Sequence, residues 1–280
     1  MTQKNVKNEQ HEDKTFRFYQ IMWYPIPRNK NVFAYCFKCE AWENDQKFSW
    51  DKSSEFLDEY LSYINKWGSL FPHFPFVKEI YLANSITFNA LSSDSDIDLF
   101  VVCEKGRVWL SRLIISFLMM IFWIKRNKKN YKKRFCLSFF VDDENENLKG
   151  IMLGKKDIYL AYWVAHLVPL YSESWVVSVY EKNSWIQHYL PNITLQQNIF
   201  LWNKIFSGRW WFKKCIEFLF AWKIWNAIEH VVQKKWGCRM KKIIAKNPEA
   251  HRWTVYEKWM LKFYKDMRKY YSDLFFWDDN

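Results

Sequence analysis

The chain has 280 residues, of which 50% are apolar, so it is long enough to bury the core of one large domain or two smaller ones. Its longest uncharged apolar run, residues 113–124, is shorter than the ~20 residues that a bilayer span needs, which argues against a transmembrane protein. The formal net charge of +12 suits a polyanionic partner or a nucleoside triphosphate, although a solvated helix surface explains it equally well.

The aromatic content is unusual, because the chain contains 18 Trp and only 6 Gly. Abundant Lys, Asn, Ile, Phe and Tyr fit an AT-rich gene, whereas abundant Trp does not. We therefore hypothesise that a reassigned stop codon places Gly at some of these Trp positions. Trp123, which stands directly before a basic stretch, motivates the hypothesis.

The N-terminal quarter of the chain divides into two parts. Residues 1–14 are polar and charged and predict a disordered tail. Residues 15–74 predict an N-terminal helical segment, in which apolar residues at positions 56, 57, 60, 61, 64 and 67 have helical spacing. We expect this helix to cover residues 53–67, with Ser53 or Ser54 as its N-cap.

The six cysteines are scattered, and the chain opens with polar residues rather than a signal peptide, which predicts reduced thiols in a cytoplasmic protein. Cys36 and Cys39 are close in sequence, but a zinc site needs four ligands. No second Cys or His pair lies at a suitable spacing nearby, so we expect these two residues to be structural.

Two predicted strands surround the most informative stretch of the sequence. Residues 77–82 predict the first strand, and the apolar run after Asp98 predicts the second. Alternate side chains of a strand share a face, so Asp96 and Asp98 are expected to lie together at the start of the second strand. Two carboxylates this close repel each other, and a divalent cation between them would relieve the repulsion.

This stretch resembles the polymerase-beta-type nucleotidyltransferase superfamily, in which a strand, a Gly-Ser turn and a short helix precede a Ser-Asp-x-Asp-Leu strand. Ser85 matches the turn serine, and residues 95–99, Ser-Asp-Ile-Asp-Leu, match the second strand. Asn84 replaces the family's Gly, and Asn tolerates a left-handed backbone. The resemblance implies that Asn84, Ser85 and Ser95 contact a nucleotide, and that Asp96 and Asp98 bind Mg²⁺ (or Mn²⁺).

The next elements bear on a third carboxylate that the superfamily usually places beside the first two. Residues 108–123 predict a helix, and residues 135–141 predict a third strand. The matching positions of that strand hold Cys136 or Ser138, whereas Asp142 has the right parity but lies roughly 13 Å beyond Ser138. Asp142 is therefore a candidate for the third catalytic acid only if a twist or bulge of the strand brings it nearer. Arg107 and Arg112 are candidates for triphosphate contacts, unless they only flank the helix.

Beyond residue 150 the patterns predict helices at residues 156–170, 173–190, 211–236 and 256–276. His166 lies among apolar residues and is expected to be a hydrogen-bonded core histidine rather than a base. A stripe at helical spacing is expected to be core rather than a platform for stacking bases; it consists of Trp211, Cys215, Phe218, Trp222 and Trp225.

Together these patterns predict an α+β protein with a small mixed β-sheet at residues 75–150 and a helical domain at residues 151–280. The implied reaction moves a nucleoside monophosphate from an NTP to an acceptor that the sequence does not identify. Two alternatives stay open. One is a catalytically degenerate protein of the same fold that binds nucleotide or nucleic acid. The other is a peripheral membrane protein.

Overall fold

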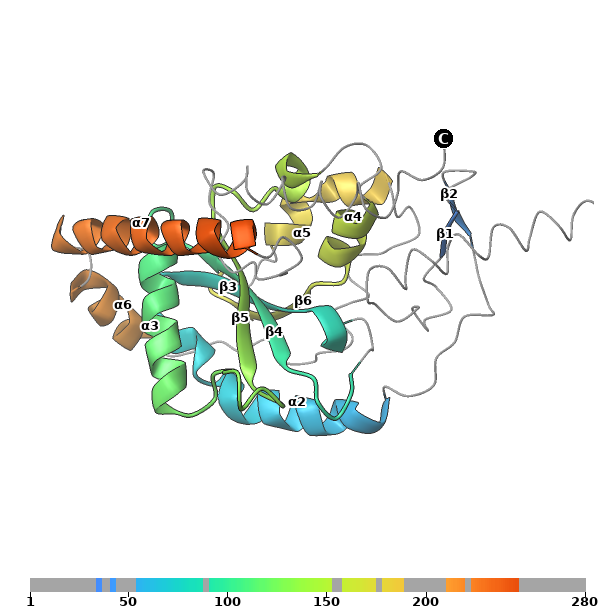
Figure 1. The fold of residues 1–280 in the computed structure, drawn as a ribbon, viewed down its shortest axis with the longest axis horizontal. Coiled ribbons are helices and arrows are strands. Elements are labelled where there is room, and N and C mark those ends of the chain that lie inside the picture. The colour runs from blue at the N-terminus through green and yellow to red at the C-terminus, as the bar shows by residue number, and fades with distance from the viewer. Residues whose placement is uncertain are drawn as a thin grey trace, which may run out of the picture.

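The computed structural model of the protein describes residues 34–36, 41–43, 54–87, 91–152, 158–174, 178–188, 210–219 and 223–246. Its centre is a four-stranded mixed sheet with the strand order β5-β4-β3-β6 (Figure 1). β4 and β5 pair in parallel, whereas β3 is antiparallel to both β4 and β6. The strands are β3 (Val77–Ala83), β4 (Ile97–Cys103), β5 (Phe135–Asp142) and β6 (Val168–Ser172). This architecture confirms the predicted α+β class and the first three predicted strands.

β6 corrects the prediction of a helix from residue 156 to residue 170. Helix α4 (Ile158–Ala165) ends early, and the chain then returns as a strand that pairs with β3. A short apolar run such as this one is equally compatible with a buried strand and with a buried helix. Pro169 is tolerated because β6 lies at the edge of the sheet, where a missing backbone N–H breaks no ladder. The sheet therefore extends into the region that was predicted to be helical.

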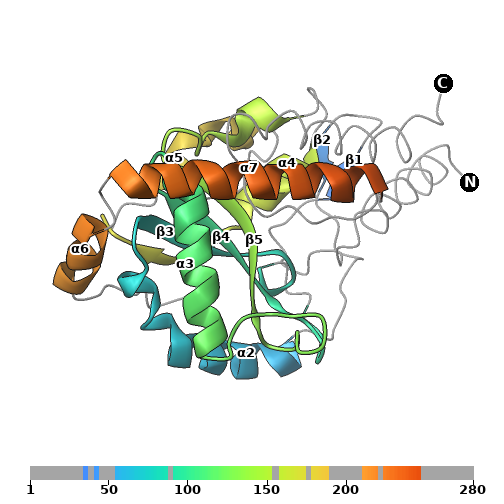
Figure 2. The same ribbon diagram turned by 60° about the vertical axis from the view of Figure 1, so that its left-hand side comes forward.

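One face of the sheet packs on α2 (Ser54–Gly68) and α3 (Val108–Ile121), as Figures 1 and 2 show. Both helices confirm the predicted ones, although α3 ends two residues earlier. Their inward-facing side chains join those of the sheet in one hydrophobic core, to which Tyr60, Ile64, Trp109, Leu99 and Phe135 belong. The predicted N-cap serines lie outside the described side chains.

The opposite face of the sheet is covered by α4 and by α5 (Ser178–Lys182). The Trp163 ring of α4 lies 5.7 Å from the Phe100 ring of β4 and 5.4 Å from the Phe139 ring of β5, measured between centroids. His166 is buried here, as expected. The predicted helix 173–190 is wrong, because α5 and a 3-10 helix, η4 (Ser184–His188), replace it around the buried side chain of Asn183.

The N-terminal part contains two short strands in addition to α2. β1 (Ala34–Cys36) and β2 (Ala41–Glu43) pair antiparallel and form a separate two-stranded sheet. The predicted segment 15–74 is thus not helical throughout. Cys39, the predicted tail 1–14 and the predicted helix 256–276 lie outside the described residues. Two further 3-10 helices are η1 (Phe71–His73) and η3 (Leu148–Ile151).

The predicted helix 211–236 is two helices, α6 (Trp210–Leu219) and α7 (Lys223–Lys246), and α7 crosses the N-terminal end of α3 (Figure 2). The prediction that Trp211 and Phe218 belong to the core is wrong, because they are 64% and 73% exposed. α6 instead buries Lys213 and Glu217, which face the start of β3. None of the described helices has the length and apolar content that crossing a bilayer would require.

Candidate metal centre

The two predicted carboxylates meet a thiol where β4 and β5 begin. Asp98 lies opposite Cys136 in the parallel pairing of these strands, and Asp96 stands just before β4. One ligand atom each from Asp96, Asp98 and Cys136 lies within 4.8 Å of the other two. The parity of the strand therefore brings the two acids together as the sequence predicted. The same parity in β5 brings Cys136 beside them.

The turn after β3 contacts this cluster directly. Ala83 pairs with Asp98 in the antiparallel ladder, so the turn that follows, η2 (Asn84–Ile86), begins beside the carboxylate. Asn84 has a φ of +59°, the left-handed conformation that Asn tolerates better than most residues. Its Nδ2 donates a hydrogen bond to Asp98 Oδ2 at 2.9 Å, and its Oδ1 accepts one from Trp163 Nε1 at 2.8 Å. The strand–turn–carboxylate arrangement predicted from the sequence is therefore present.

A β-bulge in the pairing of β4 and β5 adds a second support for Asp98. The register shifts between Leu99 and Phe100, which leaves Ser138 as the extra residue on β5. The Ser138 hydroxyl donates a hydrogen bond to Asp98 Oδ1. Both oxygens of Asp98 thus accept a hydrogen bond from a side chain, and these bonds set the direction of the carboxylate.

Arg126 is a member of the cluster that sequence reasoning missed. Its backbone N–H donates to the Phe135 carbonyl, which places the residue beside the start of β5. Its Nη1 donates to Asp96 Oδ2 at 2.5 Å and to Cys136 Sγ at 3.5 Å. In the sequence Arg126 is one of several cations in a row. The backbone pairing of residues 124–126 with Phe135 is what brings Arg126, rather than its neighbours, beside Asp96.

The electrostatics of the cluster reflect crowded negative charge. Burial raises the pKa of Asp96, and the neighbouring Asp98 raises it further, while the Arg126 guanidinium opposes both effects. Burial, followed by the two carboxylates, raises the pKa of the Cys136 thiol to about 12. A bound cation would remove the cost of holding these groups together.

The loop before β4 is held in place by α2 rather than by the cluster. The Tyr60 hydroxyl of α2 lies 2.9 and 2.7 Å from the carbonyl oxygens of Ser92 and Ser95, and these two oxygens share its one hydrogen. The Ser95 Oγ accepts a hydrogen bond from the Ser92 N–H, so this predicted nucleotide contact is part of the turn. Ser85 is half-buried beside Asn84.

Asp142 is not brought to the cluster. It lies opposite Cys103, at the end of β5 that is distant from Cys136. Six residues at ~3.3 Å each put it roughly 20 Å away along the strand. Its Oδ1 accepts hydrogen bonds from the backbone N–H groups of Glu144 and Asn145, at 3.1 and 3.0 Å. In the structure this acid caps a turn.

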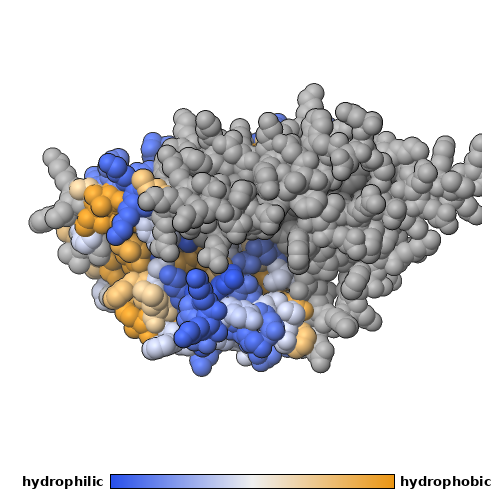
Figure 3. All heavy atoms as spheres, viewed as in Figure 1, coloured by the Kyte–Doolittle hydropathy of each residue, from blue (hydrophilic) through white to orange (hydrophobic). Residues whose placement is uncertain are grey.

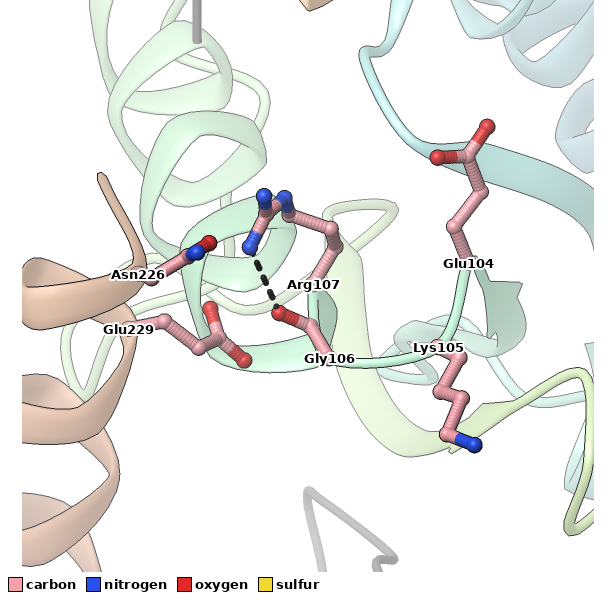
Figure 4. A pocket seen from close by; sticks show the side chains of 6 residues that line it. All are labelled: Glu104, Lys105, Gly106, Arg107, Asn226 and Glu229. Atoms are coloured by element: carbon pink, nitrogen blue, oxygen red, sulfur yellow. Dashed lines mark hydrogen bonds between the residues drawn. The ribbon is translucent and has the colours of Figure 1, made fainter. Parts of the chain in front are cut away.

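The two predicted arginine contacts also lie elsewhere. Arg112 is buried in the core, donates to the Leu137 carbonyl at 2.9 Å, and packs on the rings of Phe140 and Trp236. Burial lowers its pKa to about 9. Arg107 precedes α3 and lines a hollow of ≈520 Å³ at the far end of β4 (Figure 4).

The acidic residue of α7 that lines this hollow caps a helix, which argues against a second reaction centre there. Glu229 of α7 lines it, and its two carboxylate oxygens accept hydrogen bonds from the backbone N–H groups of Trp109 and Leu110, at 2.9 and 2.6 Å. The Glu229 carboxylate thus caps the N-terminus of α3.

Comparison of the chain with protein-family models, curated proteins and solved structures finds no match.

Proposed function

We propose that the protein is a nucleotidyltransferase that depends on a divalent cation and moves a nucleoside monophosphate from an NTP to an acceptor, with release of pyrophosphate. The observation that carries the proposal is the meeting of three features at one edge of the sheet. These are the Asp96–Asp98 pair, the Asn84–Ser85 turn, and the direct hydrogen bond between Asn84 and Asp98. The resemblance of the same stretch to the polymerase-beta-type superfamily motivates the choice of reaction.

The chain's residues have distinct parts in this proposal. Asp96 and Asp98 would hold the cation, and Asn84 and Ser138 orient Asp98 for that task. A divalent cation bound there would neutralise charge on a triphosphate and help to align it. Ser85 and the backbone amides of its turn would contact the phosphates. In the transfer, the acceptor oxygen bonds to the α-phosphorus, the bond to pyrophosphate breaks, and the acceptor proton passes to solvent.

The donor set fits this role only in part. Two carboxylates suit a hard cation such as Mg²⁺, which prefers oxygen ligands, but the third donor in reach is the thiol of Cys136. No third carboxylate approaches Asp96 and Asp98 among the described residues. The described part of the site therefore lacks a third carboxylate that could take the proton from the acceptor hydroxyl.

This shortfall favours the alternative function, a degenerate protein of the same fold that binds nucleotide without turning it over. The two functions differ in one measurement, which is release of pyrophosphate from each of the four NTPs in the presence of Mg²⁺, Mn²⁺, Zn²⁺ or Co²⁺. The assay is offered RNA, the protein itself and small hydroxyl compounds as acceptors. Nucleotide binding without turnover would establish the alternative.

The decisive variant is the double substitution Asp96→Asn and Asp98→Asn, which removes the charge and keeps the shape. We expect it to lower turnover ~100-fold or more, because metal stabilisation of the transition state is worth several kcal/mol. Asp94→Asn is the matched control, since Asp94 is half exposed and forms an ion pair with Lys132. Turnover that survives the double substitution would refute the proposed mechanism.

The membrane hypothesis has one structural observation in its favour. An exposed apolar face of α3 runs into the basic residues after it, and hydrophobic side chains gather over α3 on the left of Figure 3. The exposed residues are Leu113, Phe117, Met120, Ile121 and Phe122. Membrane association stays a prediction, and the measurement that tests it is co-sedimentation with anionic vesicles compared with neutral ones.

A further inference from the structure

Cys136 distinguishes this site from an all-oxygen cation site. It comes from β5, whereas Asp96 and Asp98 come from β4 and the residue before it, so the pairing of two strands sets the three donors together. Within the described residues this is the one place where three Cys, His, Asp or Glu donors converge. Cys103 is buried in the core, and Cys215 and Cys238 are exposed on α6 and α7.

We propose that Cys136 is the third protein ligand and that the site selects a thiophilic divalent cation of the Zn²⁺ class over Mg²⁺. Thiolate is a soft ligand that Mg²⁺ avoids, while Zn²⁺ and Co²⁺ accept mixed sulfur and oxygen donors. Three protein ligands leave coordination positions open for water or a phosphate oxygen, as in catalytic zinc sites. The inference deepens the proposed function, since the same two carboxylates hold the cation, but binding itself needs no nucleotide.

Arg126 shows that the same three donors already attract positive charge. Its guanidinium contacts two of them, Asp96 and Cys136. A cation bound by all three donors takes over this neutralising role, and Arg126 must give up its contact with the sulfur. The thiol loses its proton to solvent when it becomes a ligand, so each cation bound releases a proton. No oxidant or other reactant is needed.

Cobalt reports the ligand directly. Titration of the metal-free full-length protein with Co²⁺ should produce the near-ultraviolet charge-transfer absorption of a thiolate bound to cobalt. Cys136→Ser should abolish this absorption and weaken Zn²⁺ binding on the order of 10-fold or more, with Mg²⁺ binding unchanged. Cys215→Ser is the matched control and should keep the absorption, because Cys215 is exposed on α6. Zn²⁺ should displace the cobalt, whereas a large excess of Mg²⁺ should not.

A second measurement needs no variant. Bound Zn²⁺ should protect Cys136 from alkylation, as located by peptide mass spectrometry, and Mg²⁺ should give no protection. Cobalt bound without the charge-transfer absorption, or an absorption that persists in Cys136→Ser, would overturn the inference. The two proposals fail separately. Turnover together with cobalt binding that lacks the thiolate absorption would support the proposed function and refute Cys136 as a ligand. The thiolate–cobalt absorption without turnover would support Cys136 as a ligand and refute the proposed function.

Discussion

The two ends of the sheet both carry half-buried or buried charge, but they use it differently. Where β4 and β5 end, the acids bind backbone: Glu229 caps α3, and Asp142 caps the turn after β5. Where these strands begin, Asp96 and Asp98 face each other and Cys136, and side chains rather than a helix or a turn orient Asp98. Charge that binds backbone stabilises the fold, whereas the crowded charge of Asp96 and Asp98 is offset by the side chain of Arg126, whose neutralising role a bound cation could take over.

We expect the largest effect from a substitution at the end of the sheet where Glu229 caps α3, and the quantity that changes is stability. Glu229→Gln removes the charge and leaves one backbone N–H of α3 facing an amide donor, so we expect a loss of about 2 kcal/mol in the free energy of unfolding. Urea denaturation measures it. Glu144→Gln is the matched control and should cost no more than about 0.5 kcal/mol, because Glu144 is exposed and its ion pair is with the exposed Lys105.

Glu229→Gln also tests whether the two ends of the sheet act independently. Cation binding by folded Glu229→Gln should equal that of the unsubstituted protein, because the capping bonds of Glu229 lie at the N-terminus of α3, at the opposite end of the sheet from Asp96 and Asp98. A loss of cation affinity at full folding would break the comparison, since it would show that the two ends are coupled.

Substitution of Asn84 should have a smaller effect, at the end of the sheet that carries Asp96 and Asp98. Asn84→Ala and Asn84→Gly both remove the hydrogen bonds to Asp98 and Trp163, so we expect each to weaken cation binding about 10-fold. They should differ in stability, because Ala in the left-handed conformation costs roughly 1–2 kcal/mol and Gly avoids that cost. Calorimetric titration and urea denaturation measure the two quantities. Unchanged cation affinity in both variants would show that Asn84 does not position Asp98.

Substitution of Trp123 should give the smallest change, which is an increase in the free energy of unfolding. The Trp123 and Ile124 N–H groups bond to the Met120 and Met119 carbonyls at 3.0 Å, which closes α3 as a Schellman motif. Trp123 has the left-handed φ of +57° at the position that prefers Gly, and its side chain is 78% exposed. Trp123→Gly should therefore raise the free energy of unfolding by about 1 kcal/mol.

Phe122→Gly is the control for that substitution. Phe122 has a φ of −84°, so Gly relieves no strain there and should lower the free energy of unfolding by roughly 0.5–1 kcal/mol. Equal changes in the two variants would mean that the left-handed backbone at residue 123 carries no cost.

Local patterns were enough to predict much of the fold and the centre of the site. The apolar runs predicted β3, β4 and β5, and the alternation of a strand predicted that Asp96 and Asp98 share a face. Helical spacing predicted α2 and α3. The Asn84 turn followed from the order of its residues. These features depend on neighbours within a few positions of the chain.

The remaining features depend on contacts between distant segments, which local patterns do not contain. The strand pairing of β6 with β3 decided between helix and strand for an ambiguous run. The bulge opposite Leu99 and Phe100 turns Ser138 toward Asp98, and the hydrogen bond from the Arg126 N–H to the Phe135 carbonyl places Arg126 beside Asp96. α6 faces inward with Lys213, which donates to the Val77 carbonyl at 2.6 Å, so Trp211 and Phe218 of the predicted stripe are exposed instead.

The left-handed backbone at residue 123 also bears on how the gene is translated. If the codon there specifies glycine in the native host, peptides from the natively produced protein will carry the lighter residue at this position. The surface would then lose the most exposed of its large apolar side chains in the described residues. Protein made from a gene that encodes Trp at this position would then differ from the native molecule three residues before Arg126.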